Sequence, residues 1–177
     1  MSSKFGTKIN VDAVIGYMPK KAHENDAAYD LFVKERTEIS PNQRCYISLG
    51  FRIQLPPNMK LQILPRSGQS GKGMILNVDY PSWLGGGGFM GKVRENCDVI
   101  VGLIDCGYGK DVKAIVKSGS FKWKHRLLRL LGFKFYLASR DRICQGAFTY
   151  VPGINLVEGP VNGTREGLGS TDKVTAI

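Results

Sequence analysis

The sequence has few metal-binding side chains. Two histidines and four cysteines occur in 177 residues, and no two cysteines form a Cys-x-x-Cys pair. A structural zinc site needs such closely spaced ligands. We therefore expect free, buried thiols at Cys45, Cys97, Cys106 and Cys144.

Long apolar runs and acidic side chains are also scarce. No stretch after Met1 is long and apolar enough for a signal peptide or a membrane span. This favours a soluble intracellular protein, cytoplasmic or nuclear, with no membrane partner. Lysine and arginine outnumber the acidic residues by 25 to 15, which gives a formal net charge of +10. Such a charge attracts nucleotide phosphates, nucleic acid and acidic lipid alike.

Helical periodicity is rare, whereas short segments rich in β-branched and aromatic residues recur between turn signals. This pattern is typical of an all-β sandwich or barrel, and we expect mostly antiparallel sheets. The composition is that of a folded protein, and the length predicts one domain. The predicted strands are residues 9–15, 28–33, 45–55, 60–64, 99–104, 112–116, 133–137 and 143–151.

Residues 123–131 are the one stretch with helical periodicity, because four leucines alternate there with His125, Arg126 and Arg129. A basic amphipathic helix would suit a membrane surface or a nucleic acid. A long hairpin whose basic tip packs on its own sheet explains the same pattern and is favoured. Residues 153–177 are rich in glycine and lack an apolar rhythm, which predicts an arm that a neighbouring subunit or a ligand must order.

Two glycine patterns resemble nucleotide-binding loops, but the residues around them do not fit such loops. Residues 86–91 match G-x-G-x-x-G, and extension to Lys92 approaches a phosphate-binding loop. No parallel strand precedes this stretch and no helix is predicted after it, while Val93 replaces the hydroxyl residue that would bind Mg²⁺. We expect a surface loop.

Five short segments carry the residues best suited to nucleotide chemistry. They are Ala27-Ala28-Tyr29-Asp30-Leu31, Pro65-Arg66-Ser67-Gly68, Gly102-Leu103-Ile104-Asp105 with Tyr108, Arg142-Ile143-Cys144-Gln145, and Arg165 with Gly167-Leu168-Gly169-Ser170-Thr171. In this order they resemble the five motifs of the trimeric dUTPase family, the deoxyuridine 5′-triphosphate nucleotidohydrolases. The resemblance implies an all-β, distorted jelly-roll (β-clip) barrel that forms a homotrimer, with a β domain over residues 1–152 and an arm over residues 153–177 that closes a neighbouring active site.

The second segment is suited to a phosphate on physical grounds alone. Arg66 offers a bidentate charge, Ser67 a hydroxyl donor and Gly68 a close backbone approach. The resemblance implies further that Asp105 is the general base, which activates the water that attacks the α-phosphorus of dUTP and yields dUMP and pyrophosphate. It also implies that the ring of Tyr108 excludes a 2′-hydroxyl.

Other contacts with the substrate follow from the same resemblance. Main-chain groups around Gly102 and Ile104 would bind uracil, Gln145 would reach the α-phosphate, and Asp30 would join the Mg²⁺ and water network. Arg142, three residues before Gln145, should point to the opposite face of the strand and fix the strand end or a subunit contact. The arm would bind the uracil and the terminal phosphate through Arg165, Leu168, Gly169, Ser170 and Thr171.

The chain departs from the family pattern in its loops and its arm. Loop insertions lie near residues 80–96 and 119–132, and Leu168 and Asp172 replace the Phe and the last Gly of the usual arm. Three hypotheses result. The leading one is an active Mg²⁺-dependent dUTPase, the second is a non-catalytic trimer whose basic insertions contact protein or nucleic acid, and the third is a dCTP deaminase, which would need a catalytic Glu that is not evident.

Overall fold

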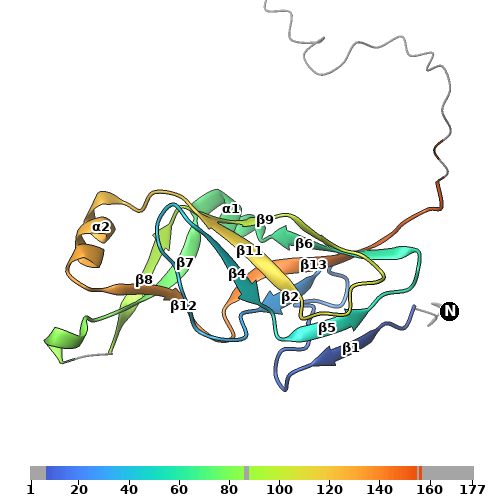
Figure 1. Ribbon diagram of the computed structural model, residues 1–177, viewed down its shortest axis with the longest axis horizontal. Helices are drawn as coiled ribbons and strands as arrows, with labels where there is room; N and C mark the ends of the chain where they lie inside the picture. The colour runs from blue at the N-terminus through green and yellow to red at the C-terminus, as the bar shows by residue number, and fades with distance from the viewer. Residues whose placement is uncertain (1–6, 86–87, 155, 157–177) are drawn as a thin grey trace, which may run out of the picture.

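The computed structural model describes residues 7–85, 88–154 and 156, which form small sheets and two short helices (Figure 1). The strands are β1 (Asn10–Ala13), β2 (Tyr29–Phe32), β3 (Thr37–Glu38), β4 (Arg44–Ser48), β5 (Phe51–Gln54), β6 (Met59–Pro65), β7 (Met74–Asp79), β8 (Phe89–Glu95), β9 (Cys97–Ile100), β10 (Gly102–Ile104), β11 (Lys113–Ser118), β12 (Lys134–Leu137) and β13 (Arg142–Tyr150). The helices are α1 (Ser67–Lys72) and α2 (Trp123–Leu130), with a 3-10 turn η1 (Ser82–Leu84).

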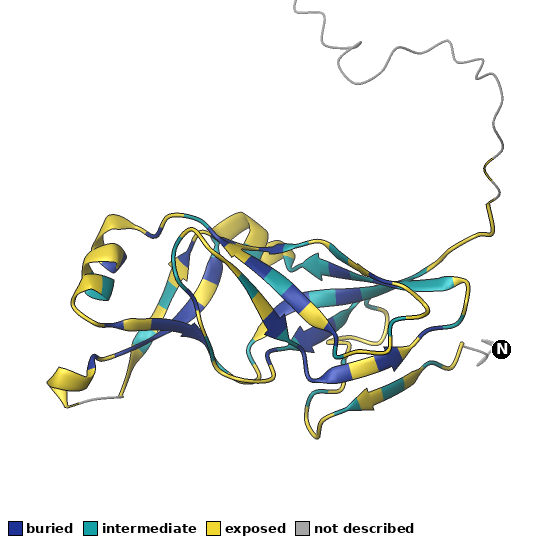
Figure 2. Ribbon diagram, viewed as in Figure 1, coloured by how far each residue is buried: buried dark blue, intermediate teal, exposed yellow. Residues whose placement is uncertain are grey.

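The strands of the described chain pair antiparallel, as the sequence predicts. The sheets have the orders β10-β6-β13-β2, β4-β11-β9, β3-β12-β7-β8 and β1-β5. Burial alternates along the strands, so that in β5 the side chains of Phe51 and Ile53 are buried and those of Arg52 and Gln54 are exposed. The buried residues of several strands form one core, which runs through the middle of the molecule (Figure 2). Each such side chain stabilises the fold by about 1.5–3 kcal/mol on burial.

The sheet β10-β6-β13-β2 carries most of the predicted site. β13 packs closely here, because a Cβ at Gly146 would lie 3.0 Å from Leu61 Cδ1 and 3.2 Å from Leu31 Cδ1. A larger residue at Gly146 would require the side chains of Leu61 and Leu31 to move. β2, β6 and β13 therefore pack closely at this point.

Two predicted strands are wrong in their extent. Residues 45–55 form β4 and β5, separated by Gly50, whose positive φ (+74°) makes a turn that L side chains rarely adopt. Residues 99–104 form the ends of β9 and β10, which belong to different sheets. β3, β7 and β8 were not predicted, and β7 carries two buried polar residues, Asn77 and Asp79, that hide its strand pattern.

The stretch with helical periodicity forms a helix, so the favoured hairpin tip is wrong. α2 ends where Gly132 adopts a φ of +90°, and the chain then enters β12. Its inner side carries the buried His125 and the partly buried Leu128. No described helix is long and apolar enough to cross a membrane.

The two predicted insertions lie against each other and form what we call the insertion lobe, residues 80–85, 88–96 and 119–134. Trp83 Nε1 donates to Leu131 O at 3.0 Å, and the rings of Tyr80 and Phe133 lie 5.8 Å apart. The lobe occupies the end of the molecule opposite β1 (Figure 1). The rejected glycine loop leads into β8, which pairs antiparallel with β7 and is not followed by a helix.

Candidate functional site

One cluster of predicted site residues lies where β6 ends. β6 pairs with β13, so that Leu64 lies beside Gln145 and Pro65 beside Cys144. β13 also pairs with β2, which places Asp30 beside Gln145. Three of the five segments therefore meet at one end of this sheet.

Asp30 is the centre of this cluster. Its carboxylate is buried and lies 3.5 Å from Arg66 Nε and 3.1 Å from Arg142 Nη1. A buried carboxylate needs such partners because an unpaired charge away from water is costly. Arg66 Nη1 also donates to Arg142 O at 3.4 Å. Asp30 and the Arg142 carbonyl together fix the direction of the Arg66 guanidinium.

A cavity of about 280 Å³ opens beside the cluster and is lined by three cationic side chains and no carboxylate. Its lining residues are Arg66, Ser67, Gly68, Gln69, Lys72, Ile75, Arg94 and Gln145. Such a lining favours an anion, because charge-assisted hydrogen bonds from cations are stronger than neutral ones. This is the geometry that a phosphate group needs.

Sequence patterns predicted four of the eight lining residues and missed Gln69, Lys72, Ile75 and Arg94. Lys72 reaches the cavity from the last turn of α1, a short helix that has no apolar periodicity in the sequence. Arg94 had no sequence signal either. It comes from β8, in one of the predicted insertions, and its Nη1 donates to Gly73 O at 3.0 Å.

A second cluster lies in the segment that follows β10, residues 105–112, which we call the hairpin although β10 and β11 belong to different sheets. Tyr108 N donates to Asp105 O at 3.1 Å and closes a turn, and the Tyr108 hydroxyl donates to Asp111 O at 3.1 Å. Asp111 is itself held by Ser48, whose hydroxyl donates to its Oδ2 at 2.6 Å. The ring of Tyr108 is therefore fixed at both ends, while the side chain of Asp105 is exposed.

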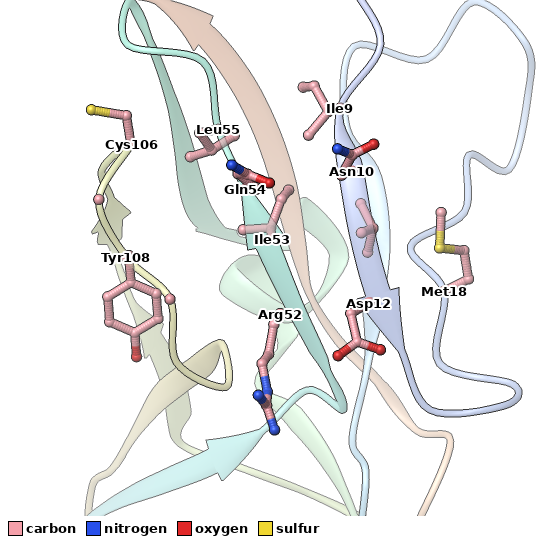
Figure 3. A pocket seen from close by; sticks show the side chains of 13 residues that line it. Ile9, Asn10, Asp12, Met18, Arg52, Ile53, Gln54, Leu55, Cys106 and Tyr108 are labelled. Atoms are coloured by element: carbon pink, nitrogen blue, oxygen red, sulfur yellow. The ribbon is translucent and has the colours of Figure 1, made fainter.

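A larger cavity of about 780 Å³ lies over β5, between this hairpin and β1 (Figure 3). Tyr108 and Cys106 line it from the hairpin, and Ile53 and Gln54 line it from β5. Its size suits a small organic ligand. Neither Asp105 nor the arginine cluster lines it, so this cavity is separate from the place where the phosphate chemistry is expected.

The two clusters lie at opposite ends of β6. β10 runs antiparallel to β6, with Ile104 beside Leu61, so Asp105 follows at the end where β6 begins. Arg66 follows the other end of β6. The five residues from Leu61 to Arg66 span about 17 Å at the usual rise of a strand. One chain does not bring Asp105 and Arg66 to the same phosphate group.

The main chain of β10 has a free edge. In the sheet order β10-β6-β13-β2 it is a terminal strand, with β6 as its one strand partner among the described residues. Gly102 and Ile104, the residues predicted to bind uracil, lie on this strand. An edge strand presents unpaired N–H and C=O groups that can pair with the edge of a base.

Two side-chain positions bear on these predictions. Asp105 follows the buried Ile104, but the neighbouring Val101 and Leu103 are more than half exposed. The strand alternation used to separate Arg142 from Gln145 is interrupted by a β-bulge between Arg142 and Cys144. Arg142 belongs to the same cluster as Gln145, and its ion pair with Asp30 joins β13 to β2.

The four cysteines are free, but they are not uniformly buried. Cys97 and Cys144 are buried, Cys45 is half-buried and Cys106 is exposed. Burial raises the pKa of the thiols of Cys97 and Cys144 to about 12. Cys106 lies in the hairpin beside Asp105, where solvent reaches it.

Asp30, the residue predicted to join the Mg²⁺ network, lies in the described part of the chain, whereas the arm residues do not. Asp30 is engaged by two arginines, and no group of three His, Cys, Asp or Glu side chains that could hold a metal occurs in the part of the chain that the structure describes. The five arm residues predicted to bind substrate lie outside the described residues. They are Arg165, Leu168, Gly169, Ser170 and Thr171.

Comparison with known proteins found dUTPases among the relatives of this chain. The dUTPase family model matches residues 16–104. The chain is 38% identical over 87 residues to the deoxyuridine 5′-triphosphate nucleotidohydrolase of Clostridium kluyveri, a match that covers 49% of this chain and 58% of the relative. It is 32% identical over 107 residues to that of Alkaliphilus metalliredigens, with 60% of this chain and 68% of the relative covered. The match to the Clostridium kluyveri protein thus spans less than two thirds of that relative.

Solved structures extend the likeness along the chain. A mutant dUTPase of Staphylococcus bacteriophage 80alpha, solved with dUpNHpp, matches with a TM-score of 0.69 at 17% identity and covers 94% of this chain and 99% of its own. A mutant dUTPase of phage phi11 of S. aureus, described with a structural Mg(II) ion, matches with a TM-score of 0.63 at 18% identity and covers 86% and 98%. These matches confirm the predicted jelly-roll fold.

Proposed function

We propose that this chain, which belongs to the dUTPase family, hydrolyses dUTP to dUMP and pyrophosphate. The observation that carries the proposal is the cationic cavity at the end of β6, which is built from residues of the second and fourth family segments and is held in place by Asp30 of the first. Fold alone does not establish an activity. The cavity supplies the chemistry that the activity needs, since an anion of several charges requires several fixed cations.

The cavity is suited to the phosphate chain of the substrate. Arg66 binds two phosphate oxygens at once, Ser67 donates a hydroxyl hydrogen bond, and Gln145 donates an amide hydrogen bond to the α-phosphate. Lys72 and Arg94 add charge on the same lining. Phosphoryl transfer depends mainly on such positioning and charge neutralisation. The role of Asp30 is to hold Arg66 in position.

The hairpin after β10 is suited to the nucleoside and the attacking water. Asp105 takes a proton from a water whose oxygen attacks the α-phosphorus, and the bond from that phosphorus to the bridging oxygen breaks as pyrophosphate leaves. The fixed ring of Tyr108 lies beneath the deoxyribose, where it leaves no space for a 2′-hydroxyl. The free edge of β10, at Gly102 and Ile104, pairs with the uracil.

The separation of these two clusters supports a homotrimer with shared sites. Since Asp105 and Arg66 follow opposite ends of β6, a second copy of the chain supplies the hairpin that meets the cavity of the first. Closed rings of subunits form through such head-to-tail contacts. Residues 153–177 would reach a neighbouring site as an arm, where Arg165, Leu168, Gly169, Ser170 and Thr171 contact the substrate.

The described residues fit a Mg²⁺ ion that is held mainly by the substrate and do not fit a metal cage made of protein side chains. Mg²⁺ often keeps several waters and binds through substrate phosphates with one or two carboxylates. When bound, it would neutralise charge on the phosphate oxygens. Asp30 would reach it only through water, since both of its oxygens have arginine partners.

The test is pyrophosphate release from dUTP with Mg²⁺, beside dTTP, dCTP and UTP. The wild type should hydrolyse dUTP alone, and Asp105→Asn should abolish turnover without changing the circular dichroism spectrum. Asp98→Asn, which alters an exposed aspartate on β9, is the matched control and should retain full activity. A folded wild-type protein that releases no pyrophosphate from dUTP would instead favour the non-catalytic trimer, and deamination of dCTP would favour the third hypothesis.

A further inference from the structure

Helix α2 of the insertion lobe turns an apolar face toward solvent. The exposed side chains are Trp123 (76%), Leu127 (51%) and Leu130 (84%). Spacings of four and three residues place them on one side of a helix. We call these three residues the apolar stripe. A helix on a protein surface normally buries such a stripe against its own core, so the outward direction needs an explanation.

Polar contacts on the inner side of α2 hold the helix in this orientation. His125 is buried against the buried carboxylate of Glu95, to which it is bonded through Nδ1. The same carboxylate accepts from Lys122 N at 3.1 Å. Arg129 donates to Ser40 Oγ at 2.7 Å. Rotation of α2 to bury the apolar stripe would break these contacts and leave Glu95 buried without a partner.

A second group of exposed apolar residues borders the first. Trp83 and Leu84 of η1 are 68% and 53% exposed, and Phe89 on β8 is 57% exposed. The hydrogen bond from Trp83 to Leu131 O ties η1 to the end of α2. Figure 2 shows both segments as largely exposed at the same end of the molecule. Large exposed apolar residues gathered at one end of a protein are typical of an interaction site.

The charge of the lobe restricts what can bind there. Its described residues include Lys92, Arg94, Lys122, Lys124, Arg126, Arg129 and Lys134, whereas Glu95, buried against His125, is its one acidic residue. Lys124 and Arg126 lie on the two sides of the apolar stripe, at helical positions about 100° and 60° from Trp123. The surface therefore offers an apolar centre between cations, with no exposed carboxylate in the described lobe.

We propose that the insertion lobe docks on an anionic lipid surface. The apolar stripe and Trp83 would enter the boundary between headgroups and acyl chains, while Lys124 and Arg126 contact acidic headgroups. A nucleic acid is less suitable, because its charged phosphates would lie against the apolar leucines. A second copy of the lobe is also less suitable, because the basic side chains of the two lobes would repel each other. The apolar stripe, Lys124 and Arg126 are outside the proposed substrate-binding residues, whereas Arg94 of the same lobe lines the phosphate cavity. The proposal departs from the expectation from the sequence that no membrane is involved.

The experiment is flotation of the full-length protein with vesicles of phosphatidylcholine alone and of phosphatidylcholine mixed with phosphatidylglycerol. The protein should float with the acidic vesicles and remain behind with the neutral ones. Both tryptophans of the chain, Trp83 and Trp123, lie in the lobe, so their emission should shift to shorter wavelength on binding. Hydrolysis of dUTP is measured in parallel, because it reports the proposed active sites, which contain none of the residues that are substituted in the lobe.

Two pairs of substitutions separate apolar insertion from charge attraction. Leu127→Ser with Leu130→Ser should lower partitioning about tenfold or more, because each leucine loses its burial. Lys124→Ala with Arg126→Ala should lower it about 25-fold, since each basic side chain near an acidic surface contributes about fivefold. Tyr46→Ser, an exposed apolar residue on β4, and Lys113→Ala with Lys117→Ala on β11 are the controls and should change neither partitioning nor dUTP turnover.

Some results would overturn the proposal. No flotation with acidic vesicles would do so, and so would flotation that the leucine pair leaves unchanged, because the protein would then be adsorbed by charge alone. Binding of an acidic amphipathic peptide or of an oligonucleotide, without vesicle binding, would assign the surface to a protein or to nucleic acid. Loss of dUTP turnover in the leucine variant would mean that the stripe belongs to the enzyme instead.

Discussion

Two inactive variants should restore activity when they assemble together. Arg66→Ala removes the proposed main phosphate ligand and Asp105→Asn removes the proposed base, so each variant alone should be inactive. If each site takes Arg66 from one subunit and Asp105 from the next, a trimer that contains both variants still has one intact site. This prediction follows from the placement of the two residues at opposite ends of β6.

The magnitude follows from the ring geometry. A mixed trimer has three junctions between neighbours, and just one of them joins a subunit with intact Arg66 to a subunit with intact Asp105 in the required direction. Its activity per trimer should be about one third of the wild-type value. If each site were formed within one chain, no mixture would be active, because every site would lack either Arg66 or Asp105.

The assay is co-expression of the two variants with different affinity tags, followed by purification over both columns, so that only mixed trimers remain. Pyrophosphate release is then compared with the wild type and with each variant alone. Gln145→Ala in place of Arg66→Ala provides a second pair, in case the loss of Arg66 weakens folding through Asp30. Mixed trimers of either pair that remain inactive would refute the argument from β6.

Further predictions concern the ion pair and the thiols. Asp30→Ala should lower the free energy of unfolding by about 2–3 kcal/mol, because it leaves the Arg66 guanidinium without its carboxylate; urea denaturation measures this loss, and an unchanged midpoint would contradict it. Cys106 should be the first thiol to react with Ellman's reagent, and Cys106→Ser should remove that rapid phase. Cys97 and Cys144 should stay unreactive while the protein is folded, since their pKa is raised from 9.0 to about 12. The unfolded chain therefore loses these protons at lower pH than the folded chain, so stability should fall as the pH rises from 9 toward 12, and a flat profile in thermal denaturation there would count against it.

The periodicity of the leucine-rich stretch in the insertion lobe does not predict which side of its helix faces the core. The leucine-rich stretch was expected to pack on its own sheet, and its helical alternative was the less favoured one. The structure places the polar residues of α2, His125 and Arg129, on the inside and the apolar stripe outside. The same sequence pattern is compatible with leucines that face the sheet and with leucines that face solvent. Contacts with distant residues, those of His125 with Glu95 on β8 and of Arg129 with Ser40, decide which side of the helix faces inward.

Much of the fold and part of the site could be predicted from the sequence. β-propensity and turn residues act over a few positions, so the antiparallel all-β fold and most strands could be inferred from local pattern. Membership of the dUTPase family, inferred from five segments, is confirmed. Within the second segment, the residue types of Arg66, Ser67 and Gly68 are enough by themselves to indicate a phosphate, because charge, hydroxyl and backbone access are local properties of the chain.

The remaining features depend on contacts between distant segments. Arg94 and Lys72 line the same cavity because β8 passes beside the end of α1, and no local pattern records that approach. The separation of Arg66 from Asp105 follows from the register between β6 and β10. Strand register is set by pairing across the whole sheet, where a shift of one residue turns every side chain to the other face. The residue types in the sequence therefore indicated Arg66, Ser67 and Gly68 as candidates for binding phosphate, and the tertiary structure decided that a single chain does not bring Arg66 and Asp105 together.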